Sequence, residues 1–157
     1  LPVRLTILFD ELYDDFIAMT SALKNLKLDK KTQNTIKFLS DELHAQLPDK
    51  EIMLKKLLVR ISPDLLILTV QAQLARFPEK SLQLQKILQA IEKILSENQC
   101  VSLKQLAVNG NDLQKHLGIH GKNTGTTLNF LLNAVIEEKC QNSFDELINY
   151  AKNKCAY

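Results

Sequence analysis

Apolar residues recur at helical spacing along most of this chain, and no segment alternates apolar and polar residues for long enough to suggest a strand. The longest stripes run from Leu84 to Leu95 and from Leu128 to Ile136. Polar start signals separate the stripes, as at Ser62-Pro63, where a cap residue precedes a proline suited to the first helical position. The pattern predicts an all-α array of about eight or nine short helices with no sheet, over 3–25, 30–46, 50–60, 63–76, 79–97, 102–107, 111–117, 124–138 and 143–154.

The glycines and one polar break indicate how the chain is organised. All four glycines lie between Gly110 and Gly125, so one stretch holds every position where glycine gives the backbone unusual freedom or close approach. A polar run, 96–99, follows the first long stripe. We expect a boundary there, with a helical body-like region over 1–98 and a helical tail-like region over 99–157 that contains a helix-turn-helix.

The tail-like region begins with signals for a short helix and a tight turn. Asn109-Gly110 is a turn signal, and Asn111 can cap the helix that follows. Gly118 comes just after that helix, at a position where a left-handed residue ends many helices. Ile119 supplies the apolar contact that commonly accompanies such an end.

The start of the next helix is a candidate anion site. Its expected cap is Asn123 or Thr124, and its first backbone N–H groups and the positive end of its dipole can bind phosphate. Such a site grips a nucleic-acid backbone without reading a base. The alternative is that the glycines only make a compact turn and the caps satisfy only their own helices. The residues expected at a phosphate are Lys115, Gly121, Lys122, Thr124, Gly125 and Thr126, with the Thr127 hydroxyl nearby.

Charge is modest and uneven. The 20 Lys and Arg residues outnumber the 18 Asp and Glu residues by two, and the basic excess lies between residues 22 and 60. A basic area can attract phosphates, although solvated helices often carry similar lysines. With three Tyr, six Phe and no Trp, the chain is poorly suited to binding a single strand by stacking base after base. The second expected RNA-contacting area comprises Lys24, Lys27 and Lys31, beside Lys30 and Lys37.

Other residue groupings do not predict catalysis or metal binding. His116 and His120 are four residues apart, but Gly118 breaks the helix between them and no second ligand pair follows. Adjacent acids such as Asp41-Glu42 diverge by roughly 100° on a helix, so they cannot converge on metal ions. We therefore expect no catalytic residue, no metal and no cofactor in this chain.

The cysteines and the ends of the chain suggest where the protein works. Three cysteines, an odd number, fit a reducing compartment better than a disulfide framework, so we expect a cytoplasmic protein. No apolar run is long enough to span a membrane. The chain starts with Leu1-Pro2, without a basic leader, and we take this as the edge of a larger protein.

The turn also partly matches two nucleic-acid-binding motifs. The residues from Gly118 to Gly121 have the GxxG spacing of KH domains, but that fold needs a sheet. The residues from Leu117 to Gly121 approximate the helix-hairpin-helix that clamps DNA phosphates, with a turn one residue longer. A DNA-backbone-binding module and a structural helical domain that binds protein are therefore the alternatives.

One longer pattern, NG-x-DL-xxx-LGI-xx-G-xxx-G-xx-L-xx-LL-xx-V, runs from residue 109 to residue 135 and is followed by Asn142 and an LxxxA pair. With it, the segment resembles the C-terminal region of bacterial CCA-adding enzymes, class II tRNA nucleotidyltransferases related to bacterial poly(A) polymerases. The stretch from Leu5 to Leu39 is similar, less specifically, to the helical body of that family. One departure is Lys122, where many relatives have proline. The matching residues are Asn109, Gly110, Asp112, Leu113, Leu117, Gly118, Ile119, Gly121, Gly125, Leu128, Leu131, Leu132, Val135, Asn142, Leu147 and Ala151.

The resemblance implies that this chain is the body and tail of such an enzyme. In the family, a catalytic head carries a Gly-Ser entry and an Asp-x-Asp metal pair, and a neck carries a Glu-Asp-x-x-Arg template; none of these occurs in this sequence. The body and tail hold the elbow and TψC side of tRNA, so that the 3′ end reaches the head. The implied partners are tRNA and the chain's own N-terminal head, where Mg²⁺, CTP and ATP would bind. This chain would be inactive alone, and the resemblance leaves open the oligomeric state and whether CCA, C, A or poly(A) is added.

Overall fold

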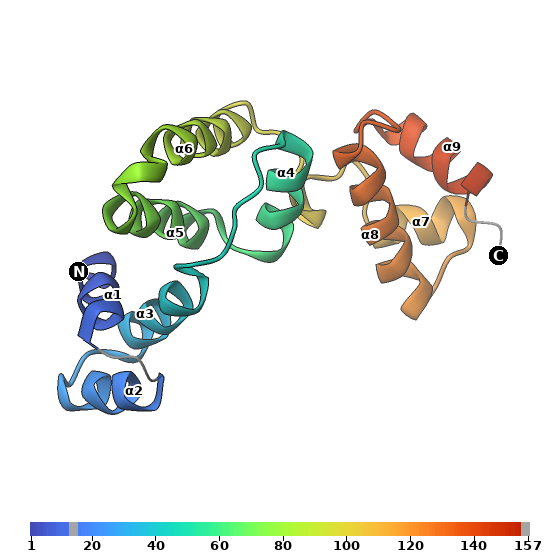
Figure 1. Ribbon diagram of the computed structural model, residues 1–157. Coiled ribbons are helices and arrows are strands. Elements are labelled where there is room, and N and C mark those ends of the chain that lie inside the picture. The colour runs from blue at the N-terminus through green and yellow to red at the C-terminus, as the bar shows by residue number, and fades with distance from the viewer. Residues whose placement is uncertain (13–15, 155–157) are drawn as a thin grey trace. The chain divides into compact units, whose positions relative to one another are not determined.

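The computed structural model describes residues 1–12 and 16–154 (Figure 1). Within these ranges the chain forms α-helices and short 3₁₀ turns and has no strand, so the predicted all-α class is confirmed. The elements in chain order are α1 (Pro2–Leu12), α2 (Phe16–Asn25), α3 (Lys30–Glu42), α4 (Glu51–Arg60), α5 (Pro63–Arg76), η1 (Pro78–Lys80), α6 (Ser81–Ser96), η2 (Leu103–Gln105), α7 (Gly110–Leu117), α8 (Lys122–Ile136) and α9 (Phe144–Lys154).

The helices divide into two compact units. The first consists of Leu1–Asp49 and Ile61–Lys93, and the second consists of Lys50–Arg60 and the chain from Ile94 onward. Helix α4 therefore belongs with α7, α8 and α9, although it lies inside the range 1–98 expected for the body-like region. The polar run at 96–99 does not anticipate this exchange of a segment.

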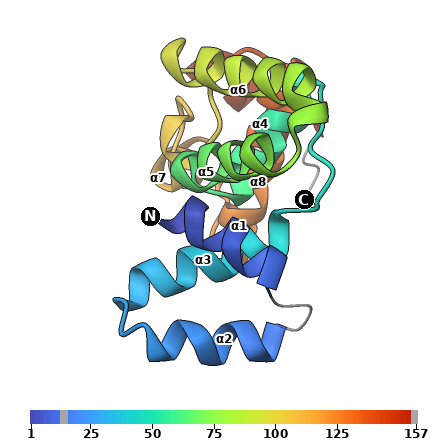
Figure 2. The same cartoon turned by 60° about the vertical axis from the view of Figure 1, so that its left-hand side comes forward.

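The predicted helix over 3–25 is wrong, because α1 and α2 are separate helices on either side of residues 13–15, which lie outside the described residues. A single helix would hold Phe9 and Leu23 about 21 Å apart along its axis. Instead the chain turns back after α2, so that α3 runs in roughly the opposite direction (Figure 2), and apolar residues from α1, α2 and α3 are buried together. The buried cluster is Phe9, Met19, Leu23 and Ile36.

Polar contacts fasten the end of α3 in the first unit. The buried side chain of Gln73 donates through Nε2 to the carbonyl oxygens of Glu42 and Ala45, at 3.1 and 2.9 Å. Glu42 ends the last turn of α3, where helices leave acceptors unsatisfied, and Ala45 follows shortly after it. The Asp10 carboxylate pairs with His44 Nε2 at 2.7 Å and with Arg76 Nε at 2.8 Å. Helix α1, the end of α3 and the end of α5 are thus joined at one place.

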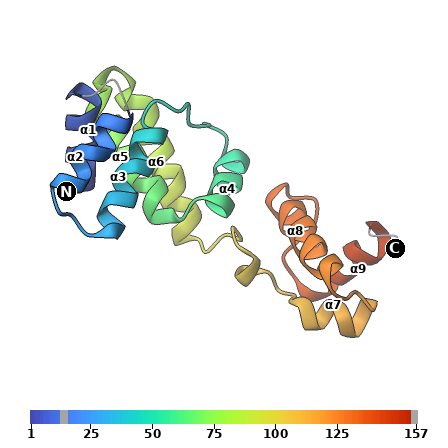
Figure 3. The ribbon, with the colours of Figure 1, turned by 90° about the horizontal axis from the view of Figure 1, so that it is seen from below.

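The second unit has an aliphatic core. Helices α7, α8 and α9 pack pairwise into the small bundle seen in Figure 3, and α4 packs against α8. Ion pairs accompany this last contact, since Lys56 Nζ lies 2.6 Å from Glu137 and Lys55 Nζ lies 4.0 Å from Glu138. The buried cluster consists of Leu106, Val108, Leu113, Ile119, Leu131, Leu132, Ile136, Leu147, Ile148 and Ala151.

The helix predicted over 102–107 is only the single 3₁₀ turn η2. The Ser102 hydroxyl does not cap it, because it donates to the Gln105 side chain, which also accepts from the Val101 N–H at 3.0 Å. The Asn142 amide then accepts from the Ala107 N–H and donates to the Gln105 carbonyl oxygen. Side chains take the place of the helical hydrogen bonds, so the helix does not propagate.

Candidate nucleic-acid interface

Helix α7 begins two residues earlier than a cap at Asn111 would require. The cap is Asn109, whose side-chain oxygen accepts from the backbone N–H groups of Asn111 and Asp112 at 2.9 and 3.3 Å. The Asp112 carboxylate accepts in return from the Asn109 N–H at 2.9 Å, which completes a capping box. The prediction of Asn111 as the cap is therefore wrong. The Asp112 carboxylate is already engaged in a hydrogen bond at the start of the helix.

The predicted end of α7 at Gly118 is confirmed. Gly118 is left-handed, with φ 66° and ψ 19°, and its N–H donates to the Gln114 carbonyl oxygen at 3.0 Å. The Ile119 N–H reaches back to the Leu113 carbonyl oxygen at 3.3 Å, and the Ile119 side chain is buried. This double closure fixes the direction in which the chain leaves α7.

Helix α8 begins at Lys122, before either cap expected from the sequence. Gly121 occupies the cap position with φ 61° and ψ −133°, and no side chain caps the helix. Asn123 and Thr124 therefore lie inside the first turn, and their expected capping role is wrong. Because no side chain covers the helix start, backbone N–H groups at an exposed end can reach an external acceptor.

The threonines at this end do not all face solvent. The Thr124 hydroxyl donates to the Ile119 carbonyl oxygen at 3.4 Å, and the Thr126 hydroxyl donates to the Lys122 carbonyl oxygen at 3.3 Å. Thr127 is only 1% exposed and packs inward, so the expectation that its hydroxyl lies at the site is wrong. A Cβ at Gly110 would lie 2.9 Å from the Thr124 methyl carbon, so the starts of α7 and α8 are in close contact.

Gly125 differs from the other glycines of the segment. It is an exposed helical residue of the first turn of α8, and a Cβ added there would meet nothing within 4 Å. Neither the turn nor the packing requires glycine at this position. The absent side chain leaves the backbone beside Lys122 open to close approach.

The sequence around this turn contains no acidic residue. Between Leu113 and Ile136 the sequence contains no Asp or Glu, and Lys115 and Lys122 are both exposed. The outward face of α8 continues with residues that the sequence prediction did not include. Their spacing of three and four residues, opposite the leucine stripe, is the signal that could have identified them. They are Asn129, Phe130 and Asn133.

The second predicted area is not a single helical face. Lys24 lies at the end of α2, Lys27 follows it with a left-handed φ of 49°, and Lys31 lies in the first turn of α3. The three lysines are exposed around this turn, where Asp29 caps α3 by accepting from the Thr32 N–H at 2.9 Å. The area is a basic loop, and the lysines flank one carboxylate.

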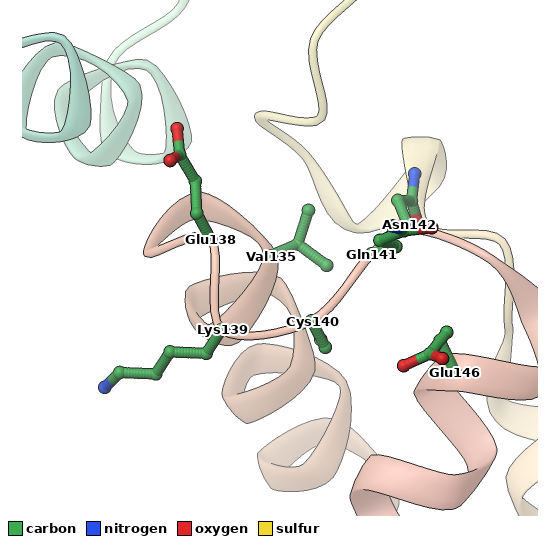
Figure 4. Close-up of a pocket in the computed structure, with 7 residues that line it drawn as sticks. All are labelled: Val135, Glu138, Lys139, Cys140, Gln141, Asn142 and Glu146. Carbon is green, nitrogen blue, oxygen red and sulfur yellow. The ribbon is translucent and has the colours of Figure 1, made fainter.

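A cavity of about 530 Å³ follows α8, and Cys140, Asn142 and Glu146 are among the residues that line it (Figure 4). Burial raises the pKa of the Cys140 thiol, and the nearby Glu146 charge raises it further, so the thiolate form is disfavoured. The Asn142 amide is engaged in its two backbone contacts. Across the described residues, no three His, Cys, Asp or Glu side chains gather as a metal ion requires.

The sequence matches the family model for tRNA nucleotidyltransferase domain 2 over residues 6–151. The chain belongs to this family. The match confirms the resemblance to the body and tail region of CCA-adding enzymes, and it spans both units of the tRNA nucleotidyltransferase domain. No curated protein and no solved structure gave a significant match.

No single helix in the described part of this tRNA nucleotidyltransferase domain is long and apolar enough to cross a membrane. The bent pair α4 and α5 passes the same test, by length and composition only.

Proposed function

We propose that this tRNA nucleotidyltransferase domain 2 is the tRNA-binding region of a CCA-adding enzyme. It holds the elbow of tRNA in the cytoplasm while a separate N-terminal head, with Mg²⁺, CTP and ATP, adds nucleotides to the 3′ end. The chain supplies grip and position, and it is inactive alone.

One observation carries this proposal: the first turn of α8 has no side-chain cap and lies in an acid-free, exposed stretch. The nearest acids on either side are occupied, since Asp112 closes the capping box and Glu137 pairs with Lys56 and Lys139. A phosphate approaching Gly121, Lys122 and Gly125 would therefore meet a helix start without a side-chain cap and a lysine in an acid-free stretch of sequence. The basic loop of Lys24, Lys27 and Lys31 is proposed as a further backbone contact.

The first prediction concerns binding and its dependence on salt. We expect fluorescence anisotropy to show that this chain prefers tRNA to duplex DNA and single-stranded RNA, with affinity falling between about 50 and about 200 mM salt. Lys122→Glu should weaken tRNA binding and lower the salt slope by roughly one. Lys86→Glu, on exposed α6, makes the same charge change and should have a much smaller effect.

Three outcomes would contradict parts of the proposal. Equal losses in the two variants would mean that net charge, and not the start of α8, governs binding. A preference for duplex DNA would favour the helix-hairpin-helix alternative. Weak, salt-independent association with all three nucleic acids would favour the structural domain that binds protein.

A further inference from the structure

The aromatic residues of the second unit are placed unusually. Its buried cluster contains only aliphatic side chains, although aromatic side chains contribute most to many cores. The Phe and Tyr residues described in this unit are Phe130, Phe144 and Tyr150, and each keeps part of its surface exposed. Phe130 and Phe144 are both 38% exposed. Core packing therefore does not account for the exposed rings of Phe130 and Phe144.

Two of the rings form a stacked pair. Phe130 on α8 and Tyr150 on α9 have ring centroids 5.7 Å apart and planes inclined by 26°. Tyr150 packs against the aliphatic core, and this contact holds it in place beneath the more exposed Phe130. A ring supported in this way presents a flat apolar surface that does not have to be ordered on binding. By contrast, Phe144 meets the exposed His116 edge to face, with planes inclined by 81°.

The pair lies beyond the proposed phosphate contacts along α8, and Phe130 projects about 80° around the helix from Lys122. Phe130 follows Lys122 by eight residues, which is about 12 Å along the axis of α8. Asn129 and Asn133 flank it, and each side-chain amide donates to a backbone carbonyl oxygen four residues earlier, at 2.8 and 2.9 Å. Each of these amides also has a side-chain oxygen that can accept a hydrogen bond from a base N–H group. Along its exposed length, α8 combines a cation, an open backbone, amide oxygens and a flat ring, which is chemistry suited to RNA.

We propose that the Phe130–Tyr150 pair is a stacking platform for one unpaired nucleobase of the RNA bound along α8. This inference rests on the proposed function and adds a base contact to a site otherwise limited to phosphates. A single platform does not make the protein a single-strand binder, because the remaining contacts follow the backbone.

The test uses the full chain and two RNA probes. One is a hairpin whose loop carries 2-aminopurine, and the other is a blunt duplex with the same stem. On binding, the wild type should quench 2-aminopurine fluorescence. Phe130→Leu should abolish the quenching and weaken hairpin binding about tenfold while leaving duplex binding nearly unchanged. Phe130→Tyr should restore both properties.

Phe144→Leu is the matched control, because Phe144 has the same exposed fraction in the same unit. It should bind and quench as the wild type does. Unchanged hairpin binding by Phe130→Leu, an equal loss for both probes, or no quenching by the wild type would overturn the platform. If Phe130→Leu shows no thermal unfolding transition, it is not folded, and two other measurements test the platform. The wild type should still quench 2-aminopurine, and Tyr150→Leu should show the reduced quenching and weaker hairpin binding expected of Phe130→Leu. Failure of the wild type to bind either probe or tRNA would instead overturn the proposed function itself.

Discussion

Gly118 and Gly125 are seven residues apart and serve opposite purposes. Gly118 has φ 66°, a conformation that an L side chain adopts only with strain. Gly125 has ordinary helical geometry and open space where a Cβ would stand. At Gly118, glycine stabilises the turn; at Gly125, it lowers the stability of α8 relative to alanine. Only the first of these glycines is explained by the fold.

The same substitution at these two positions should therefore have opposite effects. Gly118→Ala should lower the free energy of unfolding by about 1–2 kcal/mol, because a Cβ disfavours positive φ. Gly125→Ala should raise it by about 0.8–1 kcal/mol, because alanine is the better helix former. Urea unfolding followed by circular dichroism measures both. A Gly118→Ala variant with the same free energy of unfolding as the wild type would refute the left-handed turn.

Among the elements, helix existence was easier to predict than helix limits. The helix over 63–76 is found at those limits, because Pro63 suits only the first turn of a helix. The predicted start of α8 is two residues too late, because a glycine cap gives no side-chain signal in the sequence. The hydroxyls of Thr124 and Thr126 donate to nearby carbonyl oxygens and do not cap the helix. The sequence between α1 and α2 contains no glycine or proline, and only the common buried cluster of Phe9 and Leu23 shows that one straight helix is excluded.

The lysines predicted at the site are exposed in the structure, but the sequence could not predict how they are arranged. Lys24 and Lys31 lie on different helices, since Lys27 takes a left-handed conformation that sequence does not indicate for lysine. The exposed Phe130 was missed because an apolar residue in an amphipathic segment is ordinarily assigned to the core.

The contact between α4 and α8 should depend on pH through Glu137. Hydrogen bonds from Lys139 and Lys56 lower the pKa of this carboxyl from 4.5 to about 2. A carboxyl whose pKa is lowered by folding stabilises the folded chain at pH values above its pKa in the unfolded chain. This contribution disappears as the pH falls from 4.5 to about 2. Glu137→Gln should therefore be less stable than the wild type near neutral pH, and the difference should shrink over that interval.

Unfolding curves of both proteins at several pH values test this expectation. Glu97→Gln, on an exposed side chain just beyond α6, is a suitable control for the loss of one charge. A stability difference between Glu137→Gln and the wild type that is constant down to pH 2 would contradict a role for the ionised carboxylate. Added salt should also reduce the difference, because the pair is partly exposed.

For the whole molecule, the order of elements along the chain differs from their grouping in space. The chain leaves the first unit at Lys50, contributes α4 to the second, and returns at Ile61. Two separate stretches of sequence therefore complete each unit. A single boundary along the sequence, such as one at the polar run 96–99, does not separate two units that each consist of two stretches of chain.

Hydrogen exchange should show this grouping directly. Amides of α4 should exchange with protection like that of α8, which it contacts, and unlike that of α3 and α5. Glu137→Gln should accelerate exchange in α4 and leave α3 unaffected. Joint loss of protection in α4 and α3, with α8 unchanged, would contradict the assignment of α4 to the second unit.

The separation of α4 from α8 along the sequence also has a consequence during synthesis of the protein. Residues 61–136 must be synthesised before α8 is complete, which takes about 4–15 s at ordinary rates of translation. During this interval Leu54 and Leu58, which are buried in the finished fold, wait without their helix partner, beside the permanently exposed Ile52 and Met53. The nascent chain therefore carries an apolar segment that chaperones can bind, and slower translation prolongs that exposure.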